Sequence, residues 1–187
     1  MVEEESILNI ERDKLTPGMQ QYQDAKKENP DCVIMLRMGD FYELFYEDAV
    51  TASRELEITL TARGKHEKRA PLAGIPYHAL EGYLGRLVKK GYKVAIVEQL
   101  EDPKKAKGLV KRGCVRIVTP GTVIESSMLD EKENNYLMGL SVVDSKYSIA
   151  LADLSTGEFF TFITNDVLGD IARFSPKECV IPASLMV

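Results

Sequence analysis

Tryptophan is absent from this chain of 187 residues, and cysteine and histidine are scarce. The three cysteines, Cys32, Cys114 and Cys179, are odd in number and far apart, which argues against a disulfide framework and for a reducing compartment. Neither His66 nor His78 has a cysteine or an acid at metal-ligand spacing. We therefore expect neither disulfides nor a metal site.

Long hydrophobic runs are also missing. No run approaches the ~18 apolar residues of a membrane span, and the acidic residues 1–5 lack the apolar segment of a signal peptide. The phosphate-binding pattern G-x-x-x-x-G-K-[ST] does not occur, because neither Gly64-Lys65 nor the stretch from Gly108 has its spacing. We therefore expect a cytoplasmic protein whose chain binds no ATP or other cofactor.

Charge is distributed unevenly along the chain, although the net charge is only −5. Residues 1–59 carry 6 lysines and arginines against 14 acids, a net of −8. Residues 60–116 carry 14 against 5, a net of +9, and residues 117–187 carry 4 against 10, a net of −6. A basic middle between acidic flanks indicates a polyanion partner, although a solvated lysine-rich surface would give the same pattern.

The first two thirds of the chain predict a mixed α/β domain at residues 15–124, after a flexible N-terminus at residues 1–14. Capping residues and the spacing of apolar side chains predict helices within 15–30, 47–57 and 79–91. Short apolar or alternating runs predict strands at 32–37, 41–45, 58–63, 92–100 and within 113–124. Residues 64–70, 71–78 and 101–112 are expected to form a basic loop, turns and a charged connection. This order suits a mixed sheet with flanking helices.

A polar stretch without periodicity, residues 125–135, predicts a linker to a second domain at residues 136–187. Three strands follow, separated by turn residues at 144–146 and 155–157, so we expect an antiparallel meander. A helix at 165–176 and a short strand at 178–182 come after it. One helix covers only one face of a sheet, so this domain is expected to be truncated.

Aromatic residues are concentrated within residues 38–49, MGDFYELFYEDA, which also contain Glu43. As a strand, this segment would place Phe41, Glu43 and Phe45 on one face and residues 42, 44 and 46 on the other. As a helix, it would bury Phe41 and Phe45 in one stripe and expose Glu43. The turn residues 39–40 favour the strand.

The strand interpretation leaves one plausible use for the carboxylate. Burying the face of residues 42 and 44 leaves Phe41 exposed beside Glu43 and avoids the cost of burying an unpaired charge. A phenylalanine can wedge into a base step of duplex DNA, and deformable DNA lowers the cost of that step. Glu43 could accept a hydrogen bond from a base, although phosphates would repel it.

Several long blocks of the chain resemble one protein family. TPGMQQYQDAKKENPDCVIMLRMGDFYELFYEDA, PLAGIPYHALEGYLGRLVKKGYKVAIVEQLEDP and VRIVTPGT resemble, in this order, the amino-terminal mismatch-recognition domain of the MutS family of DNA mismatch repair proteins. NNYLMGLSVVDSKYSIALADLSTGEFFTF resembles the start of the ribonuclease H-like connector domain of that family. The resemblance covers residues 15–187.

The resemblance implies a function and a role for two residues. In the family, the phenylalanine of a Phe-x-Glu motif stacks on a mispaired base and the glutamate hydrogen-bonds to it, and the matching positions are Phe41 and Glu43. The implied partner is double-stranded DNA with mismatches or small loops, in a nucleoid-associated protein. Full-length family members form homodimers, work with a MutL-type partner, and hydrolyse ATP with Mg²⁺ in a domain absent here. We therefore expect a non-enzymatic fragment.

Basic residues supply candidates for contacts with the DNA backbone. A solvated connection would explain those in residues 101–112 equally well, and His78 could instead cap a helix. The candidates are Arg63, Lys65, His78, Lys104, Lys105, Lys107, Lys111 and Arg112.

Two other function classes stay open at this point. The chain could be a protein-interaction or structural domain that uses the aromatic cluster as a hydrophobic anchor. A nuclease is less well supported, because two-metal nucleases need converging acids. Asp144 and Asp153 are isolated, and we interpret them as turn residues.

Overall fold

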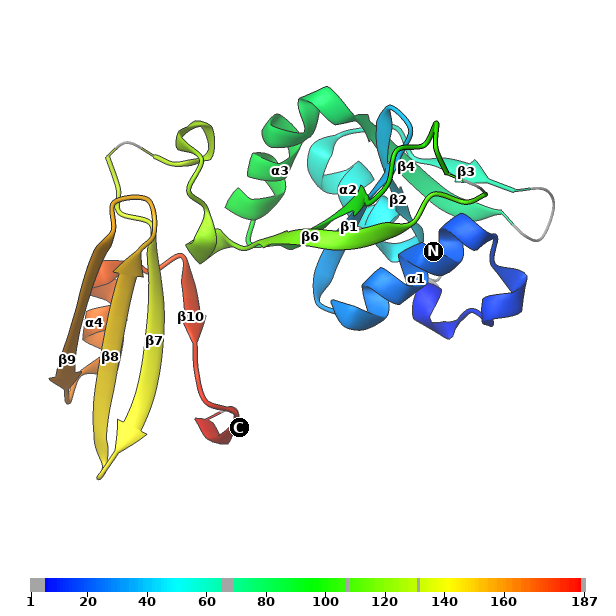
Figure 1. Cartoon of the computed structure of the whole chain (residues 1–187). Coiled ribbons are helices and arrows are strands. Elements are labelled where there is room, and N and C mark those ends of the chain that lie inside the picture. The colour runs from blue at the N-terminus through cyan, green and yellow to red at the C-terminus, as the bar shows by residue number, and fades with distance from the viewer. Residues whose placement is uncertain (1–5, 65–68, 107, 131, 186–187) are drawn as a thin grey trace. The chain divides into compact units, whose positions relative to one another are not determined.

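A computed structural model describes residues 6–64, 69–106, 108–130 and 132–185. The chain divides into two compact units, Met1–Val118 and Thr119–Val187, and each is described by itself. Both combine a sheet with helices, as the predicted mixed α/β class requires (Figure 1). Among the described residues, no helix has the length and apolar character needed to cross a membrane.

A six-stranded mixed sheet forms the centre of the first unit, in the order β3-β4-β2-β1-β5-β6. β1 is parallel to β5, and the other neighbouring pairs are antiparallel. The predicted strand segments therefore meet in one sheet, and the segment that carries the aromatic cluster lies inside it. The strands are β1 (Cys32–Met38), β2 (Phe41–Phe45), β3 (Thr61–Arg63), β4 (Ala70–Pro76), β5 (Lys93–Gln99) and β6 (Arg112–Val118).

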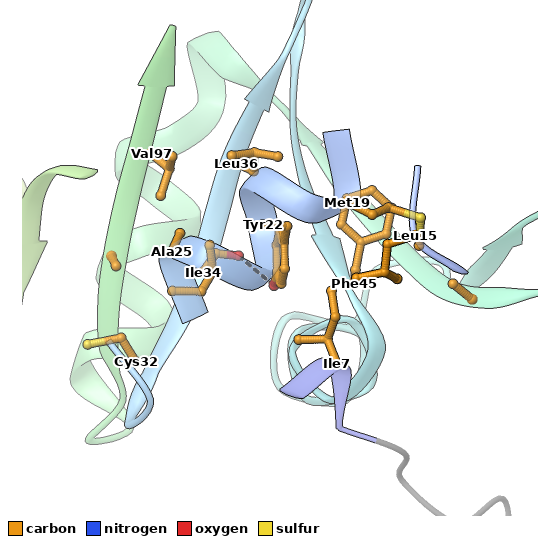
Figure 2. Packing of buried hydrophobic residues seen from close by; sticks show 12 residues of the cluster. Ile7, Leu15, Met19, Tyr22, Ala25, Cys32, Ile34, Leu36, Phe45 and Val97 are labelled. Carbon is orange, nitrogen blue, oxygen red and sulfur yellow. Dashed lines mark hydrogen bonds between the residues drawn. The ribbon is translucent and has the colours of Figure 1, made fainter. Parts of the chain in front are cut away.

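Three helices cover the two faces of this sheet. α1 (Pro17–Glu28) packs on one face, while α2 (Tyr46–Leu56) and α3 (Leu80–Lys89) contribute to the core on the other (Figure 1). Thr16 caps α1 by accepting a hydrogen bond from the amide of Met19, and Pro17 occupies the first turn, as the sequence predicts. Figure 2 shows Tyr22 of α1 between Ile34 and Phe45 of the sheet.

A buried ion pair joins α1 and α2 close to the point where β2 ends and α2 begins. Lys26 Nζ lies 2.9 Å from Oδ1 of Asp48, and both side chains are buried. Oδ2 of Asp48 accepts from the Tyr22 hydroxyl at 2.6 Å and from the Ile34 amide at 3.0 Å. Lys26 also donates to the Cys32 carbonyl. Burial acts to raise the pKa of Asp48, and Lys26 opposes this effect.

The N-terminal segment is described from residue 6 onward. Ile7 is fully buried and its carbonyl accepts from Gln23 at 2.9 Å, whereas most of residues 9–14 are exposed; residues 1–5 lie outside the described residues. One expectation for the first unit needs correction. Residues 71–78 were expected to form turns, but most of them belong to strand β4. Pairing with β2 on one side and β3 on the other overrides the low strand propensity of its proline and glycine residues.

The second unit is a four-stranded sheet in the order β10-β7-β8-β9. β7 (Tyr136–Val143), β8 (Lys146–Asp153) and β9 (Glu158–Thr164) form the predicted antiparallel meander, and β10 (Glu178–Val180) is parallel to β7. α4 (Val167–Phe174) packs on one face with Tyr136 and Met138. An open groove of about 680 Å³ also lies along this sheet, with Ile163 of β9 and Val180 of β10 among its lining residues.

Candidate functional site

The candidate site begins at the exposed end of strand β2. Phe41 is 48% exposed, whereas Tyr42, the next residue, is 3% exposed. The strand prediction is confirmed and the helical alternative is wrong, because Phe41–Phe45 pairs with β1 and β4. Phe45, on the same face as Phe41, is fully buried under α1. The face is therefore covered at one end of the strand and open at the other.

Glu43 lies between these two phenylalanines and forms an ion pair. Its side chain is 21% exposed, and its Oε2 lies 2.6 Å from Nη1 of Arg63. Burial raises the pKa of Glu43, while the charges of Arg63 and Arg112 act to lower it. The pairing explains how the sheet holds a half-buried carboxylate next to aromatic side chains without leaving it uncompensated.

Strand β4 lies beside this pair. Gly74 is directly opposite Glu43, and a Cβ at this position would make ordinary contacts with the Tyr42 carbonyl oxygen at 3.6 Å and with Cδ1 of Phe41 at 3.9 Å. β4 also separates β3 from β2, so Arg63 at the end of β3 reaches Glu43 across it.

A second group of polar and aromatic residues lies near the same end of β1 and β2. The guanidinium of Arg37 lies 3.9 Å from the ring centroid of Tyr77 and 5.6 Å from that of Tyr42. The Tyr42 hydroxyl donates to Glu98, and burial together with this bond raises the pKa of Tyr42 to about 12. These contacts fix the backbone of the strand that carries Phe41 and Glu43.

The basic candidates fall into three groups. Arg63 contacts Glu43, as described above. Arg112 is half-buried, and its guanidinium donates to the Arg37 carbonyl at 2.7 Å, to the Val110 carbonyl at 3.0 Å and to Gln21 Oε1 at 3.2 Å. It therefore braces the sheet at the end of β1. The side chains that stand exposed are His78, Lys104, Lys105 and Lys111.

Two of these exposed groups have defined surroundings. His78 lies in the 3-10 turn before α3, with its ring 5.7 Å from that of Tyr77. The exposed lysines belong to the connection between β5 and β6, where Asp102 and Glu101 accept from backbone amides. Lys65 and Lys107 lie outside the described residues.

Sequence reasoning missed the pairing of Glu43 with Arg63 and the stacking of Arg37 on Tyr77. The ion pair of Glu43 and Arg63 could not be predicted because residues 71–78 were expected to form turns. The pairing of β4 with both β2 and β3 was therefore not recognised. Alternation within the residues 70–76 was the available signal, since Ala73 and Ile75 are buried and Gly74 is exposed. The second pair joins residues 40 positions apart, and no local pattern indicates it.

The two acids considered as nuclease candidates, Asp144 and Asp153, have defined surroundings. Within the described part of the chain, no three His, Cys, Asp or Glu side chains gather as a metal site. Asp153 is buried in a turn, where its carboxylate accepts from Ser155, Thr156 and Asn135. Burial acts to raise the pKa of Asp153, but these hydrogen bonds outweigh it and the pKa lies below its usual value. Asp144 lies in the tight turn between β7 and β8, at φ +50°.

The fold and the site define a two-unit mixed α/β protein that presents an exposed aromatic residue beside a paired carboxylate. The model of MutS domain I matches residues 16–127, and that of MutS domain II matches residues 135–186. The chain belongs to the MutS family.

Curated relatives agree with this assignment. The chain is 57% identical over 180 residues to the DNA mismatch repair protein MutS of Methanococcoides burtonii, an alignment that covers 92% of this chain and 20% of the relative. It is 54% identical to that of Methanosarcina acetivorans, with 91% and 21% covered, and 55% identical to that of Acetivibrio thermocellus, with 89% and 20% covered. The chain thus spans about a fifth of the length of these relatives.

Proposed function

We propose that the first unit recognises mispaired or looped duplex DNA in mismatch repair. Phe41 acts as a stacking wedge, and Glu43 accepts a hydrogen bond from the base beside it. The observation that carries this proposal is the 48% exposure of Phe41 next to Glu43 on one strand of a MutS-family domain. The names of the curated relatives, DNA mismatch repair protein MutS, support the same function.

The geometry suits a base better than a protein anchor. Met38 and Pro76 lie opposite Phe41 on the neighbouring strands, but the residue that follows Phe41 on the same face is a charged glutamate, which a purely hydrophobic anchor would not use. An aromatic ring gains about 1–3 kcal/mol from stacking on a base. A carboxylate gains there only by accepting a base N–H, because phosphates repel it. Both preferences are met at a mispair, where bases are unstacked at least cost.

The rest of the proposal concerns a longer protein that would contain this chain. We propose that such a protein forms a homodimer around DNA, binds ATP and Mg²⁺ in an ATPase domain outside residues 1–187, and works with a MutL-type partner. The chain itself would contribute DNA recognition and no catalysis.

The test uses a chimera in which residues 16–186 replace the equivalent segment of the Methanococcoides burtonii relative. Affinities for a matched duplex and for the same duplex with one mispair are measured at two salt concentrations. Phe41→Ala is expected to lower the ratio of the two affinities by about 5- to 100-fold, the size of one lost stacking contact. A ratio unchanged by Phe41→Ala and by Glu43→Gln would exclude this site as the reader.

A further inference from the structure

We propose that Arg63 is a positioning residue for base recognition. It holds one oxygen of Glu43 and leaves the other oxygen to accept a hydrogen bond from the base beside Phe41. This inference rests on the proposed function, and it assigns Arg63 a role other than contact with the DNA backbone.

The first support is the geometry of the ion pair. Nη1 of Arg63 lies 2.6 Å from Oε2 of Glu43, and no other hydrogen bond to this carboxylate occurs among the described residues. A glutamate side chain without a partner samples several rotamers. Because Arg63 reaches it from a different strand, the ion pair fixes the carboxylate over the face that Phe41 shares. Oε1 then stays available as an acceptor.

The second support is the path between the two residues. Arg63 lies on the edge strand β3 and must cross β4 to reach β2. The position of β4 opposite Glu43 is Gly74. Arg63 itself pairs with Ala70, which packs in the same cluster as Phe45 and so marks the same face of the sheet. The register therefore places both charged side chains on one face of the sheet, and the long Arg63 side chain, which is 48% exposed, spans the β4 positions from Ala70 to Gly74 to reach Glu43.

The third support is electrostatic. A bare carboxylate near a duplex is repelled by phosphates, whereas a paired one presents little net charge. The Arg63 side chain is 48% exposed, and a guanidinium has five N–H donors, so it can keep Glu43 and still face the DNA. The other charged group that acts on Glu43 is Arg112 of β6, which is occupied with the end of β1.

A positioning role and a simple phosphate contact predict different results. Loss of a phosphate contact weakens binding to all sequences alike and reduces the salt slope by about 1. Loss of a positioning residue lowers the preference for mispaired DNA, and only while Glu43 is present. The two residues must then be non-additive in a double-mutant cycle.

The experiment has a DNA-binding arm in the chimera described above. Arg63→Gln is expected to lower the ratio of mispaired to matched affinity about tenfold, the size of one charge-assisted hydrogen bond. In the Glu43→Gln background, Arg63→Gln is expected to change the ratio less than about twofold, since the partner is gone. Arg86→Gln serves as the matched control, because Arg86 is 45% exposed and its nearest acid lies 3.9 Å away. It is expected to leave the ratio unchanged.

A second arm uses the 187-residue chain without DNA. The side-chain carboxyl carbon of Glu43 is followed by NMR as pH is varied, in the wild type and in Arg63→Gln. Arg63 and Arg112 stay charged throughout, so removal of Arg63 is expected to raise the pKa of Glu43 further above its usual value. Amide spectra report whether the fold is kept.

Two results would overturn the inference, each by itself. One is an equal loss of affinity for matched and mispaired DNA in Arg63→Gln, additive with Glu43→Gln. The other is an unchanged Glu43 titration in Arg63→Gln. Both results can be told apart from failure of the proposed function. That function is tested separately by Phe41→Ala and Glu43→Gln in a chimera that keeps Arg63.

Discussion

Tyr22 and Phe45 meet edge to face, with 5.1 Å between their ring centroids and 85° between their planes. This contact closes one end of the strand face that also carries Phe41 and Glu43 (Figure 2). α1 thus covers Phe45 and leaves Phe41 free. Because side chains alternate along a strand, Phe41, Glu43 and Phe45 share one face. Phe41, two positions before Glu43, is exposed, and Phe45, two positions after it, belongs to the core.

Phe41 and Phe45 form a matched pair for mutation. We expect Phe41→Ala to unfold at nearly the wild-type urea concentration, because its ring is half-exposed. Phe45→Ala should destabilise the first unit by about 3–5 kcal/mol, as expected for truncation of a buried phenylalanine. Urea unfolding of both variants of the 187-residue chain, followed by circular dichroism, measures the difference. Equal destabilisation would mean that Phe41 belongs to the core.

Glu43→Gln should change the affinities for matched and mispaired DNA by different amounts. Removing a carboxylate near phosphates is expected to tighten binding to matched DNA, while binding to mispaired DNA gains less because the base loses its charged acceptor. The preference for the mispair then falls about 3- to 30-fold, the worth of a charge-assisted rather than a neutral hydrogen bond. Titrations of labelled duplexes with the chimera give both affinities. Unchanged affinities would show that Glu43 is surface charge.

Much of the fold followed from local patterns in the sequence. Capping by Thr16, the turn at residues 39–40 and the spacing of apolar residues in 79–91 were enough to predict α1, the β1–β2 hairpin and α3. Local patterns failed where pairing decides the structure. β4 has two prolines and a glycine, and only its two neighbouring strands make it a strand.

The candidate site was predictable in part for the same reason. Exposure of Phe41 and burial of Tyr42 follow from alternation, whereas burial of Phe45 depends on where α1 packs. The contact of Arg63 with Glu43 needs the register of three strands, which no local pattern supplies. Burial of Ile7 depends in the same way on partners far along the chain, such as Glu47, which accepts from the Ile7 amide.

The buried ion pair of Lys26 and Asp48 should be important for stability. Asp48→Ala leaves a buried ammonium without its counter-charge, and we expect a loss of about 3–5 kcal/mol in the free energy of unfolding. The control is Asp31→Ala, which removes an exposed ion pair with Lys93 of the same 2.9 Å length and should cost no more than about 1 kcal/mol. Chemical denaturation of the two variants measures both. Similar losses would contradict a special role for the buried pair.

Asp153 should make the second unit sensitive to acid. Its pKa is lowered in the folded state, so its contribution to stability is complete above the unfolded value of about 3.9 and is lost as pH falls through the folded value. Asp153→Asn should lower stability near neutral pH and flatten its decline in acid. The stability of this unit alone can be measured from hydrogen exchange of β7 and β8 amides between pH 5 and pH 2.5. Each exchange rate is divided by the intrinsic rate of an unfolded amide at the same pH. An equally steep acid decline in the variant would exclude Asp153 as the cause.

The 187-residue chain alone should bind DNA weakly. A mispair-specific complex requires a bent duplex, and bending costs on the order of 1–6 kcal/mol. In the longer protein proposed above, other domains and a second subunit would offset this cost, and the chain covers only about a fifth of its relatives. It offers one wedge, one paired carboxylate and a segment of net charge +9 between acidic flanks.

We expect dissociation constants within or above about 10⁻⁶–10⁻⁴ M, little preference for a mispair, and affinity that falls steeply with salt. Titration of matched and mispaired duplexes at 50 and 200 mM salt, the range over which phosphate contacts are lost, measures all three. Tight, salt-insensitive, mispair-selective binding would show that this chain carries recognition without the rest of the longer protein.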